Sequence, residues 1–481
     1  MLRQATISDF EALCGLYQQV CNSLEANGLR QWQWGTYPYP ELIRSDIEAG
    51  RLYCVYGRDG MAVAVTVSTE QEAAYGQANW LFGLRPGFFH RLAVQPQHRG
   101  EGLGRAAVED VQRILLSLGC DSIRCDTGTD NGHAADFYRA LGMRSAGEIL
   151  VKGRTVPYIA FEKPLHEDCP LLPQRMSPAF RAGRLTPWGG DRLRTMYGKD
   201  IPEVPTGESL EVSCIPGLES RAPSGETLPE MIRAYGAGLV GKYDLRPFPL
   251  LLKLIDANDT LSVQVHPDDA FAAEHEGKLG KTEAWLILHA PEGAELVYGI
   301  RQGTDKAALR EACEQGAAVE PLLRRVPVRA GDVCYIPAGC VHAIGAGILL
   351  YEIQQSSDVT YRFYDWDRTD AEGHRRQLHL EQALAVTDLN LQREPIPAPD
   401  TPQSRVLDET YFSLDLICSG GRAFLPRVTD FGLLTALDEG LELCWEGASL
   451  PLRKGETFLL PCTCPRLTLK GSGRAALSMP K

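Results

Sequence analysis

The stretch LSVQVHP, residues 261–267, is one of several short strand-like runs that decide the fold of the larger part of the chain. Valine alternates in it with polar residues, the pattern of a β-strand that presents different side chains to its two faces. Similar runs are PLLLKLIDA (249–257), EAWLILHA (283–290), AELVYGI (294–300), VRAGDVCYIPAG (328–339) and ILLYEIQQ (348–355). Short strands separated by glycine and proline predict a mainly-β jelly roll or barrel, with a helical insert at TDKAALREACEQG (304–316).

Outside this region the pattern of predicted helices and strands changes, so we predict a multidomain protein. Residues 1–163 alternate helical and strand patterns, which is typical of an α/β fold. Proline-rich sequence without periodicity follows and predicts a linker at 164–179. We expect the barrel domain to occupy 180–390. Residues 391–481 are again β-rich but contain no histidine, and predict a second barrel without metal ligands.

Composition and charge exclude several classes of protein. Of the 481 residues, 44% are hydrophobic and 23% are charged, a balance typical of folded chains. A net charge of −13 argues against nucleic-acid binding, and no apolar run approaches the roughly 20 residues that span a membrane. The N-terminus MLRQATISDF lacks the apolar core of a secretion signal, and the 14 cysteines include no CxxC pair. We therefore expect a cytoplasmic protein with reduced thiols.

A glycine-rich turn, RGEGLG at 99–104, lies between a predicted strand and the amphipathic run GRAAVEDVQRILLSLG. Backbone N–H groups of such a turn, together with the N-terminus of the following helix, form a site suited to a pyrophosphate. Glycines permit a close approach of the anion and positive φ angles. The alternative is a plain strand-to-helix turn without a ligand.

The combination of LAVQPQHRGEGLG (92–104) with DNGHAADFYRALGM (130–143) resembles the GCN5-related N-acetyltransferase (GNAT) family. The resemblance implies an α/β fold in which a central strand diverges from its neighbour and acetyl-CoA lies in the gap. It also implies that an amine of unknown identity is the acetyl acceptor. The implied coenzyme-binding residues are Leu92, Val94, Arg99, Gly100, Gly102, Gly104 and Asn131.

By the same resemblance, Tyr138 matches a tyrosine that donates a proton to the departing thiolate, a general-acid role. The alternative is that Tyr138 is a buried helix aromatic whose hydroxyl merely finds a partner. The whole domain could also be a coenzyme A sensor without turnover, or purely structural.

Polar side chains of the predicted barrel suggest a metal site. With a period of two, Gln264 and His266 share one face of their strand, and Lys281 shares a face with Glu283. His342 follows the strand of YIPAGCVHA. Two imidazoles, one carboxylate and one amide oxygen suit Zn²⁺ with room for water or substrate, although iron and manganese tolerate the same set. The alternative for each histidine is a core residue satisfied by hydrogen bonds.

The motifs LSVQVHPDD, GKTEAW, YIPAGCVHA and SSDVTYRFYDWDR resemble type I mannose-6-phosphate isomerase, a family of cupin barrels, over residues 176–481. The resemblance implies that mannose 6-phosphate and fructose 6-phosphate are interconverted through a cis-enediol. The implied zinc ligands are Gln264, His266, Glu283 and His342. Further implied site residues are Arg362 as active-site arginine, Lys281 as pocket lysine, Glu352 as a cavity acid and Ser262 beside the sugar phosphate.

The reaction needs a base, and the sequence leaves its identity open among Glu352, Lys281 and a water on the metal. Arginine is a poor base at its ordinary pKa, so Arg362 suits the neutralisation of negative charge. Two other functions remain for the barrel: a metal dioxygenase, since two histidines and a carboxylate also suit Fe(II), and a sugar-binding regulator without turnover.

Overall fold

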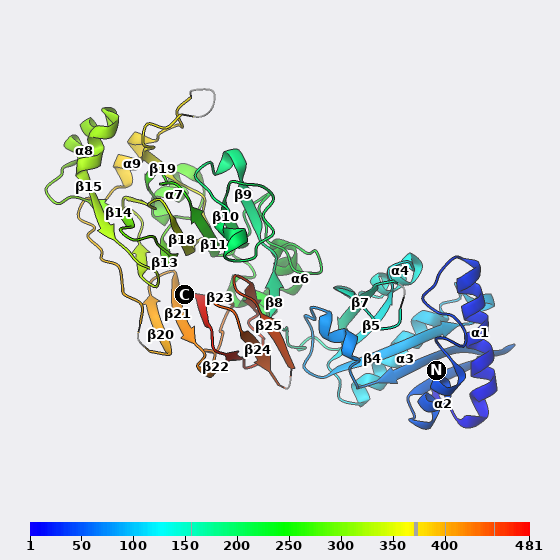
Figure 1. Ribbon diagram of the computed structural model, residues 1–481. Helices are drawn as coiled ribbons and strands as arrows, with labels where there is room; N and C mark the ends of the chain where they lie inside the picture. The colour runs from blue at the N-terminus through cyan, green and yellow to red at the C-terminus, as the bar shows by residue number, and fades with distance from the viewer. Residues whose placement is uncertain (155, 370–373, 400, 447) are drawn as a thin grey trace. The chain divides into compact units, whose positions relative to one another are not determined.

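The chain folds into two compact units, Met1–Gln174 and Arg175–Lys481, which are described separately. The computed structural model describes residues 1–154, 156–369, 374–399, 401–446 and 448–481 (Figure 1). All 14 cysteines are free thiols. Within the described ranges, no helix is both long and apolar enough to cross a membrane. The boundary predicted at 390/391 lies inside the second unit and stays a prediction.

The first unit is built on a seven-stranded sheet with the order β1-β2-β3-β4-β5-β7-β6. The strands are β1 (Arg3–Gln4), β2 (Leu52–Gly57), β3 (Gly60–Ser68), β4 (Pro86–Val94), β5 (Ser122–Gly128), β6 (Arg144–Ile149) and β7 (Tyr158–Pro164). The α-helices are α1 (Phe10–Ala26), α2 (Pro40–Glu48), α3 (Leu103–Ser117) and α4 (Gly132–Ala140). Short 3-10 turns lie at η1 (Ile7–Asp9), η2 (Ala73–Gln77) and η3 (Pro96–His98).

Helices cover both faces of this sheet because its central strands are apolar on both sides. Val63 and Val65 of β3 pack in a core cluster with α3 and α4, whereas Ala64 packs in a second cluster with α1 and α2. Alternate residues of a strand point to opposite faces, so β3 serves both cores. The result is a three-layer α/β fold, in agreement with the predicted class.

The sheet opens between β4 and β5, which form its parallel pair. Their pairing covers Pro86–Phe88 with Ser122–Arg124, after which the two strands have no further ladder contact. Both strands continue beyond that point, β4 to Val94 and β5 to Gly128. The strands therefore diverge toward the glycine-rich turn that precedes α3, as the family resemblance implied.

The second unit contains two pairs of sheets. The first pair has the orders β16-β13-β18-β11-β10-β9 and β15-β14-β17-β12-β19. Its strands are β9 (Ala179–Ala182), β10 (Thr206–Val212), β11 (Leu250–Ala257), β12 (Val263–Val265), β13 (Glu283–His289), β14 (Glu295–Ile300), β15 (Leu323–Pro327), β16 (Val333–Ile336), β17 (His342–Ala343), β18 (Ile348–Gln355) and β19 (Tyr361–Tyr364). This pair is the cupin-type domain.

The second pair has the orders β20-β21-β28-β23-β26-β8 and β22-β27-β24-β25. Its strands are β8 (Gln174–Met176), β20 (Gln403–Asp408), β21 (Phe412–Cys418), β22 (Gly421–Phe424), β23 (Gly432–Ala436), β24 (Leu441–Trp445), β25 (Ala448–Leu452), β26 (Thr457–Leu460), β27 (Thr468–Gly471) and β28 (Arg474–Pro480). Strand β8 lies within the stretch 164–179 for which the sequence predicts a linker, so part of that stretch is sheet.

Helices of the second unit lie outside the sheets. They are α5 (Arg192–Thr195), α6 (Leu228–Val240), α7 (Asp269–Glu276), α8 (Lys306–Glu314) and α9 (Leu380–Val386), with 3-10 turns η4 (Gly183–Leu185), η5 (Gly241–Tyr243) and η6 (Gly316–Leu322). Val263 and Val265 of β12 pack in one cluster with Leu309 of α8 and Leu384 of α9. The intervening Gln264 therefore faces the opposite way, into the space between the two sheets.

Candidate functional site

Three strands from both sheets of the cupin-type domain carry three of the predicted metal ligands, and His266 directly follows one of these strands. In β12, Gln264 lies directly opposite His342 of β17 on one side and Arg362 of β19 on the other. Residues directly opposite in an antiparallel pair project from the same face, so this register gathers the three side chains. Glu283 starts β13 in the facing sheet, beside Gln354 of β18. The predicted set thus meets across the interior of the sandwich.

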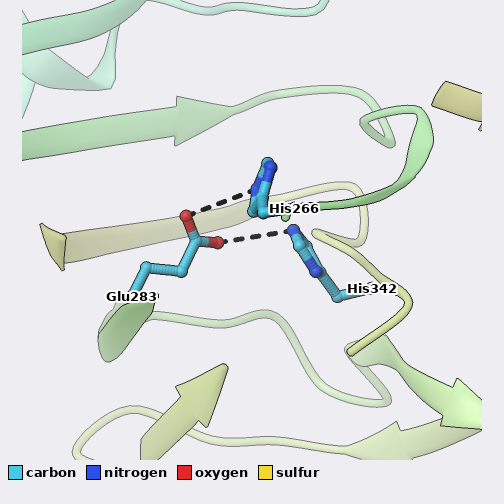
Figure 2. A group of neighbouring side chains, drawn as sticks. All are labelled: His266, Glu283 and His342. Atoms are coloured by element: carbon cyan, nitrogen blue, oxygen red, sulfur yellow. Dashed lines mark ion pairs between the residues drawn. The ribbon is translucent and has the colours of Figure 1, made fainter. Parts of the chain in front are cut away.

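The carboxylate of Glu283 faces both histidines and presents one oxygen to each (Figure 2). Its Oε2 is 3.5 Å from Nε2 of His266, and its Oε1 is 3.4 Å from Nε2 of His342. All three residues are buried, and one ligand atom from each lies within 4.8 Å of the others. Among the described residues, Glu283 Oε1 has no hydrogen-bond partner, whereas Oε2 lies 2.7 Å from the Lys281 ammonium. The three residues have the spacing and the donor atoms that a divalent cation requires.

Backbone carbonyls orient both imidazoles. The Nδ1 of His266 lies 2.9 Å from the carbonyl oxygen of Val359, and the Nδ1 of His342 lies 2.9 Å from that of Cys340. A carbonyl can only accept, so each Nδ1 carries the proton and each Nε2 lone pair points toward Glu283. Burial lowers the pKa of His342 to about 4 and that of His266 well below its usual value, with Lys281 adding to the effect on His266. Both rings are therefore neutral metal donors at neutral pH.

Gln264 and Lys281 complete the group. The Gln264 Nε2 lies 3.2 Å from the His342 Nε2, and a half-turn of the amide would direct Oε1 to the same place. The Lys281 ammonium lies 2.7 Å from Glu283 Oε2 and 3.0 Å from His266 Nε2. Burial, followed by the nearby Glu352, raises the pKa of Glu283 to about 7, while Lys281 opposes the shift. A positive charge at this point thus stabilises the ionised carboxylate.

A cavity of about 130 Å³ adjoins the group. Its walls include all of the predicted residues outside the His-Glu-His triad, namely Ser262, Gln264, Lys281, Glu352 and Arg362. The Nε of Arg362 is buried without a hydrogen-bond partner among the described residues. Burial, and then Arg376, lowers the pKa of Arg362 below its usual range. An anionic ligand in this cavity would satisfy both the charge and the unpaired donor.

The opening between β4 and β5 in the first unit forms a cavity of about 640 Å³. The predicted coenzyme-binding residues all line it: Leu92, Val94, Arg99, Gly100, Gly102, Gly104 and Asn131. Gly100 and Gly102 have φ angles of +85° and +81°, which favour glycine, and Gly102 caps α3. The N-terminus of α3 therefore opens on the cavity with no side chain on its cap.

Tyr138 also lines this cavity and packs against the rings of Phe89, Phe137 and Phe161. Burial raises its pKa well above 10, and Cys125 and Asp126 add to the shift. The phenol consequently keeps its proton at neutral pH. Both interpretations of Tyr138, cavity acid and packed aromatic, are compatible with this position, and its catalytic role stays a prediction.

Comparisons with known proteins agree with the two sites. The sequence profile of "Phosphomannose isomerase type I, catalytic domain" matches residues 182–294. The mannose-6-phosphate isomerase of Streptococcus mutans is 39% identical over 284 residues, which are 57% of this chain and 89% of that protein. The chain belongs to the type I mannose-6-phosphate isomerase family. The crystal structure of the Bacillus subtilis enzyme is similar to this isomerase with a TM-score of 0.57 and 33% identity, covering 64% of this chain and 99% of that one.

The isomerase carries an acetyltransferase domain at its N-terminus. The profile of the "Acetyltransferase (GNAT) family" matches residues 18–143. An aminoglycoside N(6')-acetyltransferase of Stenotrophomonas maltophilia is 27% identical over 150 residues, which are 31% of this chain and 89% of that protein. The predicted fusion of a GNAT domain with a type I mannose-6-phosphate isomerase is therefore confirmed, whereas the roles of individual site residues stay predictions.

The isomerase cavity also contains charged residues that the sequence did not single out. Glu208 of β10 accepts from Arg181 at 3.0 Å and lies 3.5 Å from the Lys253 ammonium. Lys253 is buried and lies 3.1 Å from Glu352, which also accepts a hydrogen bond from the Trp285 indole at 2.8 Å. Lys253 could have been found as the one charge inside the apolar run PLLLKLI. No comparable sequence pattern marks Arg181 or Glu208 as site residues, because nothing in the sequence indicates that they meet in the fold.

Glu352 is held as a carboxylate by this arrangement. Burial alone would raise its pKa, but Lys253 and Lys281 outweigh burial and leave the pKa below its usual value. The cavity thus has an ionised acid on one wall and Arg362 on another. A carboxylate that is both buried and ionised can accept a proton from a bound sugar.

Proposed function

We propose that the cupin-type domain is a zinc-dependent aldose–ketose isomerase that interconverts mannose 6-phosphate and fructose 6-phosphate through a cis-enediol. The observation that carries this proposal is the buried triad of His266, Glu283 and His342, whose neighbours Gln264 and Lys281 line a cavity together with Arg362. Two neutral imidazoles, a carboxylate and the Gln264 amide are a donor set that suits Zn²⁺. When bound, Zn²⁺ supplies Lewis acidity toward the sugar oxygens.

The residues of the chain divide the remaining work. We assign Arg362 to the phosphate or to the negative charge of the enediolate, since its guanidinium lines the cavity with an unpaired Nε. Ser262 lines the same cavity and can hydrogen-bond the sugar phosphate. Lys281 supplies a second positive charge beside the triad. These groups bind and orient an anionic sugar, and the small cavity limits the water around it.

Glu352 is the group that we assign to proton transfer. As a carboxylate it can accept the proton from C2 of the aldose and return it to C1 of the enediol. O1 gains a proton when the enediol forms and O2 loses one when the enediol collapses, which gives the ketose. The indole of Trp285 holds Oε2 at 2.8 Å and leaves Oε1 beside Lys253 at 3.1 Å. Lys281 fits this role less well, because its ammonium contacts Glu283 and would first have to lose its own proton.

Replacement of Glu283 by Gln tests the metal assignment at constant side-chain size. We expect loss of bound zinc and at least about a 100-fold loss of fructose 6-phosphate formation, since a buried carboxylate ligand is removed. Glu442→Gln in β24 is the matched control in the barrel without histidines, and it should keep both zinc and turnover. A folded Glu283→Gln protein with unaltered turnover would contradict the assignment, and zinc binding without any isomerisation would favour a regulator.

Exchange of the C2 hydrogen with solvent deuterium tests the proton carrier. Wild-type protein should incorporate deuterium from heavy water into recovered mannose 6-phosphate and into fructose 6-phosphate. Glu352→Gln should abolish exchange and turnover together, whereas Lys281→Met should slow turnover and retain measurable exchange. The reverse pattern would transfer the proton-carrying role to Lys281.

For the first unit we propose acetyl transfer from acetyl-CoA to an amine. In this proposal Arg99, Gly100, Gly102 and Gly104 bind the pyrophosphate, the main chain of Leu92 and Val94 pairs with the pantetheine arm, and Asn131 lies beside the coenzyme. Tyr138 donates its proton to the departing thiolate. The supporting observation is that all of these residues line one cavity at the N-terminus of α3.

A matched pair of glycine variants tests the pyrophosphate site. Gly102 and Gly119 lie before and after α3, have φ angles of +81° and +78°, and have open space where a Cβ would be. Valine therefore strains the backbone equally at both positions, but only Gly102 lines the cavity. We expect Gly102→Val to weaken acetyl-CoA binding in isothermal titration at least about tenfold, and Gly119→Val to bind as wild type. Equal affinities would refute the site.

A further inference from the structure

The large cavity of the first unit has a second wall that the coenzyme-binding residues do not use. Its side chains come from five different segments and are mostly polar or aromatic: Tyr37, Glu72, His90, Asp126, and Arg154 with Tyr158. They line the same continuous cavity as the glycine-rich turn and Tyr138. An acetyl acceptor that reaches the thioester must therefore contact this wall, so its chemistry indicates the class of acceptor.

We propose that the acceptor is a primary amine that also carries an anionic group, with its ammonium at Asp126 and its anionic group at Arg154. This inference rests on the proposed acetyl transfer, whose acceptor it specifies. The anionic group can be a carboxylate or a phosphate, because a guanidinium recognises both through paired N–H donors.

Asp126 lies where the sheet has opened. The ladder between β4 and β5 ends at Arg124, two residues earlier, so Asp126 pairs with Ala160 of β7 and has no β4 partner. Cys125 packs in the core with α3 and α4, which directs its neighbour Asp126 to the other side of the strand and to the cavity. The carboxylate is thus mostly withdrawn from solvent but accessible to a bound ligand.

Arg154 provides a positive charge on the same wall. Its guanidinium carbon lies over the Tyr37 ring, 3.4 Å from the ring centre. The neighbouring Arg91 is already neutralised, because it forms an ion pair with Asp46 and donates to the Tyr37 hydroxyl at 2.8 Å. Arg154 forms no ion pair within the part of the chain that the structure describes. It can therefore bind an anion without losing an existing partner.

His90 is the other candidate base in this wall, and it is the weaker one. Burial, and then Arg91, lowers the pKa of His90 to about 3, so its ring is neutral and accepts protons poorly. Burial raises the pKa of Asp126 to about 6, opposed by the Tyr75 hydroxyl and by Arg154, so Asp126 is ionised at neutral pH and a stronger base. The geometry above, with the carboxylate beside the opened strand, agrees with this order.

The reaction then balances as follows. The acceptor ammonium gives one proton to the Asp126 carboxylate, and the free amine nitrogen attacks the thioester carbon. A C–N bond forms, the C–S bond breaks, and the sulfur leaves with the bonding electron pair. Tyr138 protonates the thiolate to the thiol, the amide nitrogen returns a proton to the Tyr138 phenolate, and Asp126 releases its proton to solvent. The products are the N-acetylated acceptor, coenzyme A and one proton.

Pairs of amines that differ in an anionic group test the proposal. Release of coenzyme A thiol is measured with L-lysine against 1,5-diaminopentane and with glucosamine 6-phosphate against glucosamine. We expect the anionic member of at least one pair to react with a kcat/KM at least about tenfold higher, since one charge-assisted contact to Arg154 is worth about that factor. The first pair reports a carboxylate and the second a phosphate.

Variants and a binding measurement complete the experiment. Arg154→Gln should remove the preference within the reactive pair, whereas Arg44→Gln, which changes an arginine stacked on Phe10 outside the cavity, should retain it. Asp126→Asn should slow turnover with every reactive amine. Equal rates within both pairs, a preference that survives Arg154→Gln, or acetyl-CoA binding without turnover of any of the four amines overturns the inference. If titration finds no acetyl-CoA binding at all, the proposed acetyl transfer itself fails.

Discussion

The two candidate sites of the chain use opposite means to bind an anionic ligand. The isomerase cavity measures about 130 Å³ and has walls of buried side chains that form ion pairs with one another, such as Lys253 with Glu352. The acetyltransferase cavity measures about 640 Å³ and presents a helix N-terminus behind Gly100 and Gly102. Fixed charges on strands suit the small substrate that we propose for the first cavity, whereas a backbone that permits close approach suits the long, flexible coenzyme that we propose for the second.

The largest effect is expected from breaking the buried charge network. Lys253→Met leaves Glu208 and Glu352 as buried carboxylates without their common partner. Loss of one member of such a network lowers the free energy of unfolding by about 3–5 kcal/mol. This free energy of unfolding is measured by denaturant titration, and hydrogen exchange of β11 and β18 is the second measurement. The exposed Lys242→Met should change the free energy by less than about 0.5 kcal/mol, and a similarly small loss for Lys253→Met would mean that the network is not stabilising.

The second-largest effect is expected from stabilisation by ligands, which should differ between the two cavities. At a free concentration of 100 Kd, a ligand stabilises the state that binds it by about 2.7 kcal/mol. Zinc added to chelator-treated protein should slow hydrogen exchange in β12 and β13, and acetyl-CoA should slow it in β5 and α3. Chelation should abolish isomerisation and leave acetyl-CoA titration unchanged. If acetyl-CoA protected β12 as strongly as zinc does, the two sites would not be independent.

The pH dependence of acetyl transfer should report the buried carboxylate. The pKa of Asp126 is about 6, set by burial and modified by Tyr75, Glu72, Arg154 and Arg91. Because Asp126 must be ionised to accept the proton, kcat/KM should be constant above about pH 7 and fall about tenfold per pH unit well below 6. In the Asp126→Asn variant, kcat/KM should no longer decrease in this way at acidic pH. The rate of isomerisation, measured in the same samples, should not show the same dependence on pH. If it did, the loss of acetyl transfer at acidic pH would be due to general unfolding.

The smallest effect is expected at Ser262, which lines the sugar cavity without belonging to the charge network. Ser262→Ala removes one hydrogen bond to the phosphate, worth about 1.5 kcal/mol, so KM for mannose 6-phosphate should rise about tenfold with little change in kcat. Steady-state kinetics measures both, and Ser449→Ala in the other barrel is the control. A fall in kcat at constant KM would instead place Ser262 in the chemical step.

Much of the fold could be predicted, because it depends on neighbouring residues. The valines that alternate with Gln264 show which face of β12 is packed and which is polar. The spacing around Gly100 and Gly102 predicts positive φ angles before a helix, and both glycines adopt them. The stretch 164–179 was less informative, since β8 forms there by pairing with a distant strand.

The inward-facing residues and the turns that need glycine can be read from the amino-acid sequence, since these properties follow from the period of a strand and from local sterics. The folded chain was needed to show that Glu283 faces both His266 and His342, and that Asp126 lines the same cavity as Arg154. Such contacts depend on where strand pairing stops and on how sheets pack, because both are set by residues far apart in the chain.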